Sequence, residues 1–185
     1  MINKFINIRK SIIVGILILV AYSMLTYDIT KIISLGVIAD LISGFSVIGI
    51  AVIMFPIFNY NKNKFINLSF LLCKIIEGAL MIAGGALLIF PDLIRHRSYI
   101  YQNIHIYFFI AGALFFYILL LKTLLIPKFI SIWGIIASIT LFIITIIKLF
   151  GIKIDALDIL LLPMVLNEVF LAFWLIIKGF NNDKI

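Results

Sequence analysis

Apolar residues occupy this chain in long uninterrupted runs, which short stretches of charged and turn-forming residues separate. An α-helix needs about 20 mostly apolar residues to cross the hydrocarbon core of a bilayer. The expected fold is therefore an all-α, polytopic transmembrane helical bundle of about six spans. The predicted spans lie near residues 11–27, 33–58, 66–90, 103–125, 129–150 and 157–178.

The segments between these runs are short and hold the turn formers and most of the charges. The longest is about a dozen residues, which is far too short to fold alone. We therefore expect a single transmembrane domain over residues 1–185 and no soluble domain. The predicted connecting loops are residues 27–32, 59–64, 91–103, 125–128 and 151–155.

The first run has two interpretations, because Lys4, Arg9 and Lys10 precede it and the small residues Ala21 and Ser23 lie at its end. A basic start, an apolar centre and a small-residue end are the features of a secretory signal. We expect an uncleaved anchor, which gives six spans, whereas cleavage would leave five.

Composition favours lipid as the surrounding medium. Apolar residues make up 65% of the chain and charged residues 12%, whereas soluble globular proteins average roughly 45–50% and 25%. The formal charge of +7 does not indicate nucleic acid, because the 15 lysines and arginines are dispersed over short loops and form no single basic face. We therefore expect membrane lipids as partners and no nucleic acid.

The distribution of basic residues predicts an orientation. Short cytoplasmic loops of membrane proteins carry an excess of lysine and arginine. With a cytoplasmic N-terminus, nine basic residues fall on the inner side and five on the outer side, so we expect a multi-pass cell-membrane protein with both termini in the cytoplasm. The inner residues are Lys4, Arg9, Lys10, Lys62, Lys64, Lys122, Lys128, Lys178 and Lys184, and the outer ones are Lys31, Arg95, Arg97, Lys148 and Lys153.

Four charged residues lie in the interior of the predicted spans, away from their ends: Asp40, Lys74, Glu77 and Glu168. A charge at the centre of a span costs about 2.5–3.5 kcal/mol, so each of the four needs a partner. Glu77 and Glu168 are both eleven residues into their predicted spans and should lie near mid-depth. Asp40 is expected nearer the outer end of its span, as a separate and wetter site.

Lys74 and Glu77 are three residues apart and share a helix face, where an ion pair can form. Glu168 would offer the lysine a second carboxylate if the two helices are neighbours. Two acids and one base leave one negative charge, so either one carboxyl is protonated or a cation or donor-bearing ligand completes the group. The pattern is compatible with a ligand or proton site and with a structural polar knot that fixes helix order.

Pro163 removes a backbone hydrogen bond to Ile159 and is expected to kink the last span just before Asn167 and Glu168. In a membrane, the freed carbonyls are tolerated where they face protein or a water-filled cavity. Asn167 therefore joins the candidate site, and an ordinary structural kink is the alternative.

No other pattern indicates chemistry. The two histidines, His96 and His105, belong to no metal-binding motif. We expect His105 to be a hydrogen-bonded residue near the membrane surface, with a single-ligand haem or metal site as the alternative. The single cysteine, Cys73, cannot form an intrachain disulfide and is expected to be a small core residue. No catalytic residue, metal or cofactor is predicted.

Small residues four apart predict where helices approach closely in lipid. We interpret these positions as packing seams within one chain rather than as a dimer face. They are Ser69 with Cys73, Ala79 with Ala83, Gly134 with Ser138, and the flat patches Gly84–Gly85 and Ala111–Ala113.

Three stretches carry a resemblance to a known family: LLCKIIEGALMIAGG at 71–85, LLIPKFISIWGIIASI at 124–139 and LLPMVLNEVFLAFWLIIKG at 161–179. Over nearly its whole length the chain resembles the prokaryotic membrane family called domain of unknown function 4386. The resemblance implies six spans, a basic residue and a glutamate in the third, a Leu-Pro motif opening the fifth, and a glutamate followed by Trp-Leu and Lys-Gly in the sixth. Here these positions are Lys74, Glu77, Pro127, Glu168, Trp174, Lys178 and Gly179.

One position departs from that pattern. The basic residue of the third span is often arginine in the family, whereas this chain has Lys74. Lysine lacks the bidentate fork of arginine and can lose its proton when buried, so the resemblance implies a less fixed ion pair here. Because the family has no established activity, the resemblance implies topology and a site rather than a function.

The sequence thus predicts an integral membrane protein in which Lys74, Glu77 and Glu168 line a polar intramembrane cavity. We expect it to bind or transport a small or lipid-like ligand, or protons. Two alternatives stay open: an intramembrane enzyme that uses a glutamate as general acid/base on a lipid or quinone, and a structural accessory subunit. The ligand and the oligomeric state are not predicted.

Overall fold

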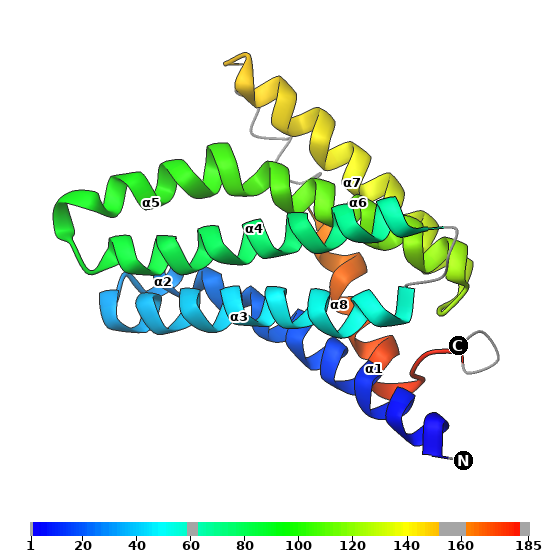
Figure 1. Ribbon diagram of the computed structural model, residues 1–185. Helices are drawn as coiled ribbons and strands as arrows, with labels where there is room; N and C mark the ends of the chain where they lie inside the picture. Colours follow the sequence, from blue (N-terminus) through cyan, green and yellow to red (C-terminus); the bar gives the residue numbers. More distant parts are fainter. Residues whose placement is uncertain (1, 59–62, 152–161, 182–185) are drawn as a thin grey trace.

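The structure is a computed structural model that describes residues 2–58, 63–151 and 162–181. Within these ranges the chain folds into helices joined by short turns and contains no strand (Figure 1). The predicted all-α helical bundle is therefore confirmed.

Five helical stretches of the described residues are long and apolar enough to cross a membrane. Three of them are single helices: α3 (Ile33–Phe58), α4 (Lys64–Leu88) and α7 (Lys128–Leu149). The helix α3 begins and ends at the predicted residues, and α4 and α7 agree with the predicted spans 66–90 and 129–150 within two residues.

The other two long stretches are built from several helical segments. The first runs through α1 (Ile2–Ala21), the 3-10 turn η1 (Tyr22–Leu25) and α2 (Thr26–Thr30). The other runs through η2 (Pro91–Leu93), α5 (Ile94–Ile100), the π-helical segment η3 (Tyr101–His105) and α6 (Ile106–Thr123).

The last helix, α8 (Leu162–Ile177), is apolar and 16 residues long. The predicted sixth span, 157–178, begins in residues that the structure does not describe, as do most of the predicted loops 59–64 and 151–155. Pro163 is the second residue of α8, and its expected partner Ile159 lies outside the described residues.

Two predicted loops are wrong. Residues 27–30 of the loop 27–32 are helical, and the chain turns at Lys31, which has a positive φ of 58°. The loop 91–103 is helical throughout. Its charges suggested exposure to water, but Arg97 is buried and paired inside the protein, so the helix has no need to end there.

The helices form a closed ring. Along it, α1 packs on α3, α3 on α4, α4 on α6, α6 on α7, α7 on α8, and α8 on α1. Consecutive helices of this ring are thus neighbours in space, as short connections favour, and the contact between α1 and α8 closes the ring by joining its first and last described helices. The start of α1 and the end of α8 lie at the same end of the ring (Figure 1).

The helices of the ring approach closely at glycines. A Cβ added to Gly44 of α3 would lie 2.6 Å from the backbone oxygen of Gly78 of α4, and the reverse distance is the same. A Cβ on Gly15 of α1 would lie 2.7 Å from the backbone oxygen of Ala172 of α8. Small residues allow such contacts between backbones in lipid, so these glycines set the spacing of two helix pairs.

Two of the predicted packing seams are confirmed. Gly85 of α4 lies against Asp40 of α3, where an added Cβ would be 3.0 Å from the Asp40 Cβ. Gly134 of α7 lies against the ring of Tyr117, so a Cβ there would overlap the tyrosine. Both seams join helices of this chain to each other.

The outer surface of the ring is apolar. Phe45 is 64% exposed, Phe65 is 81% exposed and Ile136 is 59% exposed, and each belongs to a long apolar helix. Soluble monomers rarely expose apolar patches larger than a few hundred Å². The surface is that of a membrane-embedded protein, with side chains that face lipid.

Candidate ligand cavity

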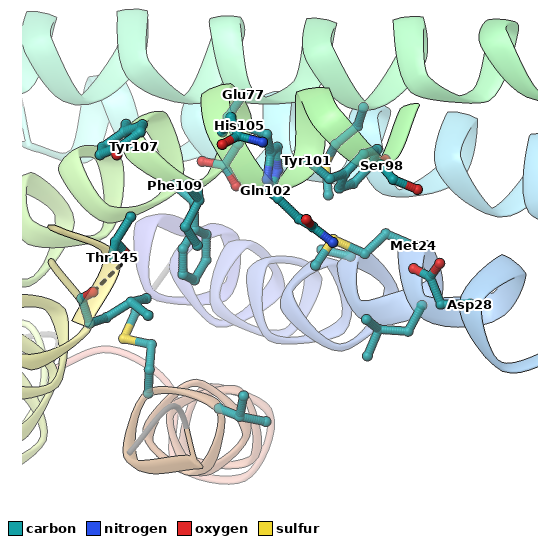
Figure 2. Close-up of a pocket in the computed structure, with 18 of the residues that line it drawn as sticks. Met24, Asp28, Glu77, Ser98, Tyr101, Gln102, His105, Tyr107, Phe109 and Thr145 are labelled. Carbon is teal, nitrogen blue, oxygen red and sulfur yellow. Dashed lines mark hydrogen bonds between the residues drawn. The ribbon is translucent and has the colours of Figure 1, made fainter. Parts of the chain in front are cut away.

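A cavity of about 750 Å³ lies inside the ring, between η1, α4, α5, η3, α6, α7 and α8 (Figure 2). Pockets that bind small molecules measure about 300–1,000 Å³ and are mostly apolar with a few polar groups. The described walls follow this pattern. The ionisable side chains of acids and bases that line the cavity are Asp28, Glu77, Arg97, His105, Lys148 and Glu168.

A smaller space of about 40 Å³ adjoins the cavity, and both share Glu77, Phe109 and Glu168 in their walls. We call this space the deep chamber. A water molecule needs roughly 10–15 Å³ of such volume, so the deep chamber holds a few small polar groups at most. Lys74 and Tyr117 complete its polar lining.

Lys74 and Glu77 form an ion pair in the wall of the deep chamber, with Nζ 2.8 Å from Oε2. They are 7% and 2% exposed. The Lys74 ammonium is thus the partner of Oε2 of Glu77, which has no other hydrogen-bond partner among the described residues. The stem of Lys74 lies against Gly112 of α6, and its Nζ is 5.3 Å from the centre of the Phe109 ring.

Glu168 reaches the deep chamber from α8, on another side of the ring. Its Oε2 accepts a hydrogen bond of 2.6 Å from the hydroxyl of Tyr22, a length typical of a hydroxyl bound to a carboxylate. Glu168 is partly exposed although it lies inside the bundle, because it faces the cavity. No described lysine or arginine lies within ion-pair distance of it.

Three further buried groups belong to residues that line these spaces and have no hydrogen-bond partner in the described part of the chain. One is the hydroxyl of Tyr117, a residue that is 0% exposed and lines the deep chamber. The others are the hydroxyl of Tyr101 and Nε2 of His105, in the cavity wall that also holds Glu77 (Figure 2). An unsatisfied buried polar group costs about 1–3 kcal/mol, so all three are groups that a polar ligand would satisfy.

The expected position of His105 near the membrane surface is wrong. Because residues 91–103 are helical, His105 lies well inside a helical stretch of 33 residues, Pro91–Thr123, and is 4% exposed. It belongs to η3, and π-helical segments occur often at functional sites. The described residues contain no group of three or more metal-ligating side chains.

A second buried charge group lies in the wall between α3 and α5. The guanidinium of Arg97 donates from Nε to Oδ2 of Asp40 at 2.8 Å and from Nη2 to Oδ1 at 3.0 Å. It also donates to the backbone oxygen of Met24 at 3.2 Å and to Asp28 at 3.4 Å. These contacts join α5 to η1, α2 and α3.

Aromatic rings complete the surroundings of Arg97. The guanidinium carbon is 5.1 Å from the centre of the Tyr27 ring and 4.5 Å from the centre of the Tyr101 ring. Arginine stacks well on aromatic faces because its cation is planar and weakly hydrated. The guanidinium of Arg97 is thus surrounded by two carboxylates, a backbone oxygen and two tyrosine rings.

The expectation that Asp40 is a wetter site is wrong. Asp40 is 0% exposed, and Arg97 binds both of its oxygens. The expectation that Arg97 lies in an outer loop is also wrong, since Arg97 is 1% exposed and paired with Asp40. Both expectations fail for the same reason: the helix α5 packs on α4 and brings Arg97 into the interior of the bundle.

Asn167 is not part of the cavity. It is 0% exposed, its Nδ2 donates to the backbone oxygen of Ile130 at 3.1 Å, and it lines neither the cavity nor the deep chamber. Its Oδ1 has no hydrogen-bond partner in the described ranges. Asn167 therefore holds α8 against α7.

Of the five candidate residues, the structure brings Lys74, Glu77 and Glu168 to one space and leaves Asp40 and Asn167 elsewhere. Sequence reasoning missed Tyr22 and Tyr117. The sequence does contain a signal for Tyr117: tyrosine prefers the ends of membrane spans, whereas Tyr117 lies in the interior of the predicted span 103–125. For Tyr22 the sequence contains no such signal.

Two positions implied by the family resemblance have a clear local structure. Pro127 directly precedes α7, where its fixed φ suits a helix start. Gly179 follows α8 with a φ of 75°, and a Cβ there would lie 3.2 Å from Oγ of Ser11. A left-handed residue after a helix is commonly glycine.

The comparisons with known proteins agree with this picture. The family described as Domain of unknown function (DUF4386) matches residues 30–179. No curated protein and no solved structure matches the chain. The matched region includes Lys74, Glu77 and Glu168, but it begins after Tyr22. Since the match covers well over half of the chain, this apolar helical bundle belongs to the DUF4386 family.

Proposed function

We propose that this protein binds a small or lipid-like ligand in the central cavity of its helix ring, as the binding step of transport across the membrane. One observation carries the proposal: Glu77 and Glu168 come from two separate helices and face one cavity of about 750 Å³, and Lys74 joins them in the adjoining deep chamber. Ionisable residues within membrane spans are costly and commonly mark substrate, ion or proton paths.

The two buried charge groups support this proposal by their difference. A structural group is stable when every buried polar atom has a partner, and Arg97 with Asp40 fits that description. The deep chamber does not, because within the described ranges the hydroxyl of Tyr117 has no hydrogen-bond partner and Oε2 of Glu77 has none besides the Lys74 ammonium. Incomplete pairing beside a cavity favours a ligand over a purely structural role.

The same proposal includes a location. We place the protein in the cell membrane, with both termini in the cytoplasm, on the basis of the nine basic residues assigned to the inner side against five on the outer. The amide of Asn181 donates to the backbone oxygen of Leu125 at 2.8 Å. The C-terminal segment therefore lies beside the connection between α6 and α7, which is also assigned to the inner side.

Photolabelling with a neutral alkyl alcohol that carries a diazirine tests the proposal. We expect labels on cavity residues such as Tyr107 and Met164. Thr145→Trp, which fills the cavity from α7, should remove these labels. Ile143→Trp is the control, because Ile143 is 52% exposed on the outer side of the same helix. Labels confined to outward-facing residues, or labels in the cavity that Thr145→Trp leaves unchanged, would contradict the proposal.

A further inference from the structure

We propose that the ligand of this cavity is a protonated amine with an apolar body, whose ammonium group binds beside Glu168 while its body fills the aromatic part of the cavity. This inference rests on the proposed function and adds the chemical class of the ligand. It is carried by the charge count of the deep chamber, by two acceptors with unused hydrogen-bonding capacity and by the aromatic walls.

The deep chamber holds one more carboxylate than it holds cations. Its described acids and bases are Lys74, Glu77 and Glu168. Lys74 is paired with Glu77 at 2.8 Å, whereas Glu168 has only the hydroxyl of Tyr22, which stabilises a carboxylate but carries no charge. With both carboxylates ionised, a monocation is the ligand that makes this space neutral, and a buried charge without a partner is strongly unfavourable.

The charges on the rest of the cavity wall do not supply that cation. Arg97 is engaged by Asp40 and Asp28. Lys148 of α7 has an interaction of its own and forms no ion pair with Glu168. The excess negative charge therefore stays at Glu168.

The acceptors of the deep chamber favour an ammonium over a cation without N–H groups. Oε2 of Glu77 can only accept hydrogen bonds when the carboxyl is ionised, and the hydroxyl oxygen of Tyr117 can accept one. Among the residues that the structure describes, Oε2 has the Lys74 ammonium as its one partner, and the Tyr117 hydroxyl has no hydrogen-bond partner. An ammonium group offers up to three donors, so it can satisfy such acceptors while it pairs with Glu168.

The aromatic lining suits a cation with an apolar body. Tyr22, Tyr101, Tyr107 and Phe109 line the cavity, and a cation near an aromatic face gains about 0.5–2 kcal/mol. The protein already binds one ammonium in this way. Nζ of Lys74 lies 2.8 Å from a carboxylate oxygen and 5.3 Å from the centre of the Phe109 ring.

Three probes with one apolar cage separate charge from shape: adamantan-1-amine, adamantan-1-ol and adamantane-1-carboxylate. Binding is measured by equilibrium dialysis against the protein in nanodiscs, with empty nanodiscs subtracted. We expect the amine to bind about tenfold or more tightly than the alcohol, and the carboxylate not to bind. Equal affinities for amine and alcohol, or a preference for the carboxylate, would overturn the inference.

Variants then locate the charge. Glu168→Gln keeps the shape and an acceptor for Tyr22, so it should lower the affinity for the amine to that for the alcohol and leave the alcohol unchanged. Asp92→Asn is the matched control, because Asp92 is exposed and lines neither space. The probe series on the wild-type protein decides the charge question even if Glu168→Gln does not fold.

The outcomes separate this inference from the proposed function. If amine and alcohol bind equally and Thr145→Trp abolishes both, the cavity binds a ligand but the cation inference is wrong. If no adamantane probe binds, the inference is overturned, and photolabelling by the neutral alcohol decides the proposed function on its own. If photolabelling of the cavity residues also fails, both the cation inference and the proposed function are wrong.

Discussion

Arg97 and Lys74 are both buried basic side chains, and their surroundings explain why they have different roles. The planar guanidinium of Arg97 matches the two oxygens of Asp40 and stacks between two tyrosine rings. The ammonium of Lys74 acts as a point charge with one carboxylate contact. The first arrangement is closed to further partners, whereas the second leaves acceptors that a ligand can use.

Asp40→Asn tests the structural role of the Arg97 group. It leaves the guanidinium buried without its counter-charge, and breaking a buried ion pair costs about 3–5 kcal/mol. We expect a loss of this size in the free energy of unfolding, measured by tryptophan fluorescence in mixed micelles of dodecyl maltoside and SDS. The separate variant Arg97→Lys should also be less stable than wild type, because lysine lacks the bidentate fork.

Arg95→Gln is the matched control for that measurement. Arg95 lies two residues away on α5 and is exposed, so its loss should change stability little. If Asp40→Asn were as stable as Arg95→Gln, Arg97 and Asp40 would not hold α5 to α3.

At the scale of elements, helix crossings set where the candidate residues lie. Gly78 directly follows Glu77, and its contact with Gly44 holds α4 against α3. This face of α4 is therefore fixed on α3, while the side chains of Lys74 and Glu77 lie toward the cavity side. Similarly, Gly15 holds α1 against α8, near the hydrogen bond between Tyr22 and Glu168 in the ring.

Gly44→Ala tests the crossing of α3 and α4. The new Cβ would lie 2.6 Å from a backbone oxygen, which cannot move without shifting α4, and overpacking of this kind costs about 1–3 kcal/mol. Gly49→Ala on the same helix is the control, because its Cβ would meet only the end of the Leu17 side chain, at 3.2 Å. We expect unfolding in mixed micelles to be easier for Gly44→Ala alone; equal stability of the two variants would contradict the close crossing.

At the scale of the whole molecule, the ring is closed by a part of the chain outside the family match. The match begins at residue 30, whereas α1 and η1 precede it and pack on α8 and α3. Tyr22 of η1 supplies the hydrogen bond to Glu168. The first helix therefore completes the cavity wall beside a glutamate that lies in the matched region.

The proposed orientation is testable with reporter fusions. Green fluorescent protein fused after Ile185 should fluoresce, and alkaline phosphatase at the same site should be inactive, because each folds on only one side of the bacterial membrane. Alkaline phosphatase fused after Gly151 is the control. It should be active, because Gly151 follows the end of α7 that the proposed orientation assigns to the outer side. The reverse pattern would show that the excess of basic residues faces outward and that the proposed orientation is wrong.

Sequence alone determined the medium and most helix limits of this protein. Runs of about 20 apolar residues can be satisfied only in lipid, and their ends follow from turn formers and charges, which is why α3, α4 and α7 were predicted closely. The need to neutralise Lys74, Glu77 and Glu168 also followed from their position in apolar runs. The charged segment 91–103 was predicted as a loop, because its buried partner could not be seen.

Only the tertiary structure decided which charges meet. Asp40 and Arg97 are 57 residues apart and Tyr22 and Glu168 are 146 apart. Helical periodicity tells which side chains share a face of one helix, but it does not tell which helix that face meets. The order of helices in the ring makes that choice. It placed Asn167 of α8 against α7, buried Asp40 with Arg97, and brought Glu77 and Glu168 to one cavity.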